Sequence, residues 1–285
     1  MRMALLAALA ASGAAGLIYQ VCWIRSATLL VGSSNRALGI VLATFFGGLA
    51  VGSTVFGRLA IRQARPLRTY AWLELGVAVL AVTSLFAFRL ADLALTRISR
   101  GGNDVVAVLA EVGILALLLG PPAALMGGSL PLFCRYFITR GDGIVSGVSR
   151  LYAVNTLGAA GGCLLAGFFL IPTVGIRASI AVGAALNVTA AAIALLRDRR
   201  AGELPILASP ADTRNPPSRV WSRRTRVVTA LLFFLTGAVA LANEVLWTRF
   251  AALLVASTIT TYSLTIGLVL LGIVIGGLLV ARVER

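Results

Sequence analysis

The sequence contains no lysine and no histidine, and only 12% of its residues are charged, about half the usual fraction. Its 25 basic residues are therefore all arginines, and against 10 acidic residues they give a net charge of +15. A strongly basic chain suggests a nucleic-acid partner, but these arginines lie between apolar runs rather than along one face. We therefore exclude nucleic acid and assign the arginines to connections that face an anionic membrane surface.

Cysteine is scarce as well. Cys22, Cys134 and Cys163 each stand alone in or beside an apolar segment, without the spacing of metal ligands. We interpret them as buried thiols and expect neither a metal nor a cofactor.

Long hydrophobic runs, in contrast, occupy most of the chain. The composition is 59% hydrophobic and the mean hydropathy is +0.96, values that a soluble domain does not reach. About 20 apolar residues suffice to cross a hydrocarbon core of about 30 Å. We place eight such spans at 4–24, 37–60, 69–90, 105–133, 152–171, 177–196, 227–248 and 260–281. The prediction is an all-α, polytopic integral membrane protein whose first span is retained rather than cleaved as a signal.

The chain also contains an internal repeat. Gly13–Ile61 aligns without a gap onto Gly237–Arg285, at a constant offset of 224 residues. Positions that match include Gly13/Gly237, Trp23/Trp247, Arg25/Arg249, Gly48/Gly272, Gly52/Gly276 and Arg58/Arg282. Such duplicated helices are typical of transporters built from repeats. Because the first and seventh spans run in the same direction, the two copies form a parallel repeat.

These features predict three segments. A six-helix unit covers 1–196, an Arg/Pro-rich cytoplasmic linker covers 197–226, and 227–285 forms the first two helices of a second, truncated unit. Arginines concentrate after the second and fourth spans and in the linker. The positive-inside rule therefore places those connections, and both termini, in the cytoplasm.

Polar residues within the apolar runs are the candidate binding residues, because a polar group in a membrane is costly and usually functional. The candidates are Gln20, Trp23 and Arg25 in the first copy, Glu244, Trp247 and Arg249 at the equivalent positions of the second, and Glu74, Glu111 and Asn155. For the two clusters, two interpretations stay open: an anchor at the outer membrane interface, or the lining of a cavity. The carboxylates Glu74 and Glu111 could instead pair with an arginine of another helix, and Asn155 and Asn187 could form interhelical hydrogen bonds.

Two further patterns concern helix packing. Small residues recur at every fourth position and predict close helix contacts. They are Gly39, Ala43 and Gly47, with Gly48 and Gly52 beside them, then Gly158, Gly162 and Ala166, and finally Ser263 and Gly267, followed by Gly272 and Gly276. The fourth run contains Gly120-Pro121-Pro122 and Gly127-Gly128, so we expect a kink or break at the prolines. Either a discontinuous helix lines a binding site, or a simple kink precedes a short interfacial turn.

Four stretches carry a family resemblance. They are GLIYQVCWIR at 16–25, PPAALMGGSLPLFCR at 121–135, RLYAVNTLGAAGG at 150–162 and GFFLIPTVGIR at 167–177. Together they resemble the membrane portion of bacterial membrane-bound spermidine synthase-like proteins, which join a transporter-like domain to a polyamine aminopropyltransferase. In that family the first motif usually carries Glu where this chain has Gln20.

The catalytic unit that this resemblance implies is a Rossmann-like domain for decarboxylated S-adenosylmethionine and a diamine. The sequence has no strand–helix alternation and no glycine-rich strand-to-helix turn to match it, so we expect no catalytic residues in this chain. The prediction is a non-catalytic module of the bacterial inner membrane that binds or transports a small polar solute, or anchors a partner enzyme. The alternative is part of a membrane-bound spermidine synthase, active only with a separate cytoplasmic aminopropyltransferase-like domain or chain.

Overall fold

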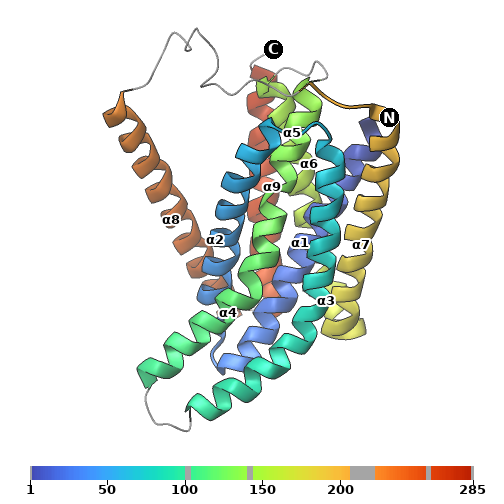
Figure 1. Ribbon diagram of the computed structural model, residues 1–285. Helices are drawn as coiled ribbons and strands as arrows, with labels where there is room; N and C mark the ends of the chain where they lie inside the picture. Colours follow the sequence, from blue (N-terminus) through green and yellow to red (C-terminus); the bar gives the residue numbers. More distant parts are fainter. Residues whose placement is uncertain (1, 100–103, 140–143, 206–221, 255–257, 284–285) are drawn as a thin grey trace.

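The computed structural model describes residues 2–99, 104–139, 144–205, 222–254 and 258–283, and these residues form helices and short connections without any strand (Figure 1). The all-α class is therefore confirmed. The elements are α1 (Arg2–Val31), α2 (Ser34–Ile61), α3 (Pro66–Ser99), α4 (Asp104–Gly127), α5 (Ser129–Thr139), α6 (Ile144–Leu165), the π-helical segment η1 (Ala166–Leu170), α7 (Ile171–Ala201), α8 (Arg223–Leu254) and α9 (Thr258–Val283).

Seven helical stretches in the described part of the chain are long and apolar enough to cross a membrane, one fewer than the eight expected. The difference lies in Gly147–Arg200, a continuous stretch of 54 residues that holds the predicted spans 152–171 and 177–196. At about 1.5 Å per residue, a straight helix of this length would exceed a membrane core more than twofold. It is not straight, because Gly175 has φ 77° and ψ 175°, and α7 runs back along the bundle after it (Figure 1).

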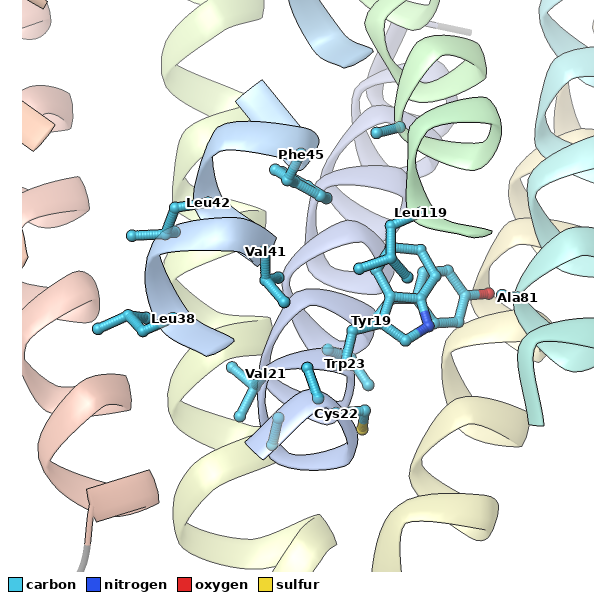
Figure 2. Packing of buried hydrophobic residues seen from close by; sticks show 14 of the residues in the cluster. Tyr19, Val21, Cys22, Trp23, Leu38, Val41, Leu42, Phe45, Ala81 and Leu119 are labelled. Atoms are coloured by element: carbon cyan, nitrogen blue, oxygen red, sulfur yellow. The ribbon is translucent and has the colours of Figure 1, made fainter. Parts of the chain in front are cut away.

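The helices pack around α1. It contacts α2, α6 and α7, and its middle is buried on all sides. Figure 2 shows the larger of two apolar clusters, in which Tyr19 and Trp23 of α1 meet Phe45 of α2 and Leu119 of α4. The start of α1, the α2–α3 connection and the end of α7 lie at the same end of the bundle (Figure 1). This arrangement gathers Arg62, Arg65 and Arg200 at that end.

Glycines permit the closest helix contacts, as the small-residue pattern predicts. A Cβ added at Gly162 of α6 would lie 2.3 Å from the backbone oxygen of Ala14 in α1, and one at Gly52 of α2 would lie 1.8 Å from that of Ala124 in α4. Of the glycines predicted to make such contacts on α2, some do and others do not. Gly39 and Gly47 have open space around them, whereas Gly48 and Gly52 face α4. A spacing of four residues alone does not select between two adjacent helix faces.

The fourth apolar run is interrupted, but not at its prolines. Helix α4 continues through Pro121 and Pro122 and ends at Gly127, and α5 begins at Ser129 after a turn at Gly128. Neighbouring helices can satisfy the backbone groups that prolines free within a membrane protein, which allows the helix to persist. A Cβ on Gly128 would lie 2.6 Å from Leu73 of α3, so this turn is pressed against α3.

The described part of the linker is anchored rather than free. Helix α7 ends at Ala201 and α8 begins at Arg223, within the predicted boundaries of 197–226, and 206–221 lie outside the described residues. The backbone N–H of Leu204 donates to the carbonyl oxygen of Ala64 over 2.9 Å. Beside it, Arg65 lies 3.2 Å from Glu203 and 3.7 Å from Asp198. The end of α7 is thereby held against the α2–α3 connection.

Helix α8 has the least support. It packs mainly on α9, and its membrane-crossing stretch is almost wholly exposed within the chain. In Figure 1 it begins apart from the bundle and approaches α2 and α9 only towards its end. That end carries Glu244, Thr248 and Arg249.

Candidate functional site

A buried polar network surrounds Glu74 at the centre of the bundle. The Ser12 hydroxyl of α1 donates to Glu74 Oε1 over 2.7 Å, and the Ser129 hydroxyl of α5 donates to the same oxygen over 2.9 Å. Asn187 of α7 donates its amide to Oε2, and its own amide oxygen accepts from the Tyr19 hydroxyl over 2.7 Å. Four helices, α1, α3, α5 and α7, thus converge on one carboxylate that is 1% exposed.

The break between α4 and α5 explains part of this network. Ser129 is the first residue of α5, so the break after Gly127 lets its hydroxyl reach Glu74 from the start of this 11-residue helix. No arginine in the described chain lies within ion-pair distance of Glu74. The sequence singled out Glu74 and Asn187 but missed Ser12, Tyr19 and Ser129. In the sequence, each of these three residues is marked only by a hydroxyl group within an apolar run. Many residues with a purely structural role have the same feature.

The other two isolated candidates have simpler surroundings. Glu111 of α4 pairs with Arg36 of α2, with 3.5 Å between Oε2 and Nη1, which is the interhelical ion pair considered above. Asn155 of α6 packs against Gly13 of α1, where an added Cβ would lie 2.2 Å from its backbone oxygen. Neither residue touches the Glu74 network through a hydrogen bond of the described chain.

The two segments that align in the sequence place their tryptophans differently. Trp23 is 0% exposed: its ring stacks on Tyr19 with 5.6 Å between ring centres, and its indole N–H donates to Ser84 of α3 over 3.0 Å (Figure 2). The interface-anchor interpretation is therefore wrong for Trp23, which is a core residue. Trp247 is 61% exposed and touches Phe250 edge to face. Gln20 is buried on α1 like its neighbour Tyr19.

The arginines of the two copies, by contrast, converge on one cavity. Its volume is about 80 Å³, and it lies between the end of α1, the start of α2, the end of α8 and the start of α9. Both Arg25 and Arg249 line it. Its walls are Val21, Ile24, Arg25, Thr28, Ser34, Asn35, Leu38, Thr248, Arg249, Ala252, Ile259 and Tyr262. Neither arginine has a carboxylate within ion-pair distance in the part of the chain that the structure describes.

Buried polar atoms without partners concentrate around the same junction. Six buried side-chain polar atoms in the described residues have no hydrogen-bond partner, and four of these belong to α8 and α9. They are Glu244 Oε1, Thr248 Oγ1, the Tyr262 hydroxyl and Ser263 Oγ. Buried polar groups in native proteins are nearly always paired, because an unpaired group costs about 1–3 kcal/mol. Two of the four, Thr248 and Tyr262, line the cavity, where a polar ligand or water can pair with them.

Glu244 lies beside this cavity rather than in its wall. It is half-buried on α8, one turn before Thr248, and close enough to Tyr262 and Cys163 to act on them electrostatically. It has no arginine partner within the described chain. The sequence thus named both cavity arginines, but nothing in the alignment of the copies indicated that the two would meet, nor that Thr248 and Tyr262 would join them.

Comparisons with protein-family models, curated proteins and solved structures find no match to this chain.

Proposed function

We propose that this protein is a non-catalytic membrane module that binds a small polar solute in the cavity between its two repeat copies and carries it across the bilayer. The observation that carries this proposal is the convergence of Arg25 and Arg249, equivalent positions of the repeat, on one cavity without acidic partners. Two uncompensated charges in a membrane protein are costly unless they face water or a ligand. If both arginines had only a structural role, nothing in the described chain would offset that cost.

The position of the cavity supports transport of the solute rather than binding alone. Transporters built from repeats bind their substrates where the repeats meet, and rocking of one repeat against the other exposes the site alternately. Helix α8 contacts the bundle mainly through α9 and through the walls of this cavity, so we propose that α8 and α9 move relative to α1 when the site opens. The buried Glu74 network, in contrast, links α1, α3, α5 and α7 through hydrogen bonds.

We also propose a transmembrane topology for the chain. The chain crosses the bacterial inner membrane eight times, with one crossing on each side of Gly175, and both termini lie in the cytoplasm. Seven apolar helical stretches, the reversal at Gly175 and the arginines gathered at one end of the bundle support it. The outer surface of the helix bundle thus contacts the lipid bilayer.

The resemblance to spermidine synthase-like proteins suggests a polyamine as solute, but the cavity disfavours it. A polyamine is a polycation, and two arginines in one small cavity would repel it. We therefore propose an anionic or neutral polar solute, and assign any aminopropyltransferase activity to a separate cytoplasmic domain or chain.

The experiment uses two adjacent positions on α8. Ala252 lines the cavity, whereas Leu253 is 83% exposed and points away from it. Purified protein is screened by thermal shift against small carboxylates, phosphate esters, neutral amino acids and putrescine, and uptake of any stabilising solute is measured in proteoliposomes. Ala252→Trp, which fills the cavity, should abolish binding and uptake, while Leu253→Trp should leave both intact. Unchanged binding in Ala252→Trp, or no stabilising solute at all, would refute the proposal.

A further inference from the structure

We infer that this cavity is a phosphoryl-group site, in which Arg25, Arg249, Thr248 and Tyr262 bind a phosphate or phosphate ester. The inference rests on the proposed function, because it names the chemical class that the same cavity accepts. It is drawn from the donors in the wall, from their lack of partners and from the absence of a carboxylate among the lining residues.

The two arginines supply the charge. A guanidinium presents its N–H donors in a planar fork that matches two oxygens of a phosphate, and it stays protonated in any protein environment. Arg25 lines the cavity from α1 and Arg249 lines it from α8. A dianionic group neutralises both at once, which a single carboxylate does not.

Two hydroxyls add donors that the protein itself leaves unused. Thr248 is 7% exposed and Tyr262 is 3% exposed, both line the cavity, and neither hydroxyl has a hydrogen-bond partner in the described chain. A tetrahedral group with three or four oxygens accepts from two forks and two hydroxyls together. This second observation is independent of the charge and indicates the same ligand.

The first turn of α2 completes the arrangement. Ser34 and Asn35 line the cavity as the first residues of a 28-residue helix, where backbone N–H groups have no partner within the helix. The positive end of the helix dipole there favours an anion. The cavity is about half the volume of an engineered cavity of about 150 Å³ that admits benzene, so it accepts one compact group of a few heavy atoms.

Two sources could supply this chemistry: a soluble phosphate ester or the headgroup of an anionic phospholipid. The experiment therefore has two arms, with the full-length protein in a phosphate-free detergent. One arm titrates inorganic phosphate and glycerol 3-phosphate by calorimetry, and the other titrates phosphatidylglycerol and counts the lipid retained by native mass spectrometry. Arg25→Gln, Arg249→Gln and Tyr262→Phe test the cavity, and Arg226→Gln, on the exposed start of α8, is the matched control.

Each arginine substitution should weaken binding about tenfold or more, because each removes a charge-assisted interaction, while Tyr262→Phe weakens it a few-fold. Arg226→Gln should bind as the unmodified protein does. These losses support the inference in whichever arm they occur, and the arm identifies the source. Binding that is equal in all variants, or absent in both arms, would overturn it. Binding of a neutral solute that Ala252→Trp blocks would overturn the phosphoryl assignment alone and leave the proposed function standing.

Discussion

Substituting alanine for a single glycine tests the packing of the central helix α1. At Gly162 of α6, the added Cβ would lie 2.3 Å from the backbone oxygen and 2.6 Å from the Cα of Ala14. Ordinary contacts begin at 3.4 Å, so α1 and α6 would have to separate by about 1 Å. Both obstructing atoms belong to the backbone, so no side-chain rotation relieves the clash. Overpacking of this kind costs about 1–3 kcal/mol.

The adjacent glycine is the control. Gly161 has nothing within 4 Å of its added Cβ, so Gly161→Ala keeps only the helix-propensity gain of up to about 1 kcal/mol. Gly162→Ala gains the same propensity but bears the clash, so we expect it to be about 2 kcal/mol less stable than Gly161→Ala. Unfolding of both variants by sodium dodecyl sulphate in bicelles, followed by tryptophan fluorescence in a background that keeps Trp23 and replaces the other three tryptophans by Phe, measures the difference. Equal stability of the two variants would refute the assigned α1–α6 contact.

Three other predictions follow from the buried network, the aromatic core and the topology. Glu74→Ala leaves three donors unpaired and should lower the unfolding free energy by about 2 kcal/mol or more in thermal denaturation. Glu74→Gln should stay close to the unmodified protein, because a flip of the Asn187 amide restores complementary donors and acceptors. Trp23→Phe removes the hydrogen bond to Ser84 and part of a fully buried ring, so it should lower the unfolding free energy by about 1–3 kcal/mol in the same assay, and an unchanged stability would contradict the core position of Trp23. In a cysteine-free background, Arg62→Cys should react with an impermeant thiol reagent only from the cytoplasm and Leu29→Cys only from the periplasm, and the reverse pattern would invert the topology.

The sequence predicted the fold class because membrane insertion imposes a strong pattern. An apolar run of about 20 residues has few stable structures other than a helix, since every backbone group must be paired internally. Local breaks were harder to place. The helix runs through Pro121 and Pro122 and turns at Gly128, because the neighbouring helices decide where a break is tolerated.

The sequence predicted which residues belong to the candidate site, but not which of them lie together in space. Arg25 and Arg249 stood out as equivalent charges in the two copies, yet equivalence along the chain does not imply contact in space. Trp23 and Trp247 show the limit of that equivalence, because one is enclosed by α2 and α3 and the other is exposed on α8. Tertiary packing, which the repeat does not encode, assigns each copy its environment.

The most direct measurement of the central claim is protection of the cavity by its own solute. In a background without Cys22, Cys134 and Cys163, a cysteine at Ala252 lies in the cavity wall, and one at Leu253 lies outside it. The rate of modification by a small charged thiol reagent is measured with and without the solute that most stabilises the protein. We predict that the solute slows modification of Ala252→Cys and leaves Leu253→Cys unchanged. Equal rates with and without solute at Ala252→Cys would contradict a binding site between the two repeat copies.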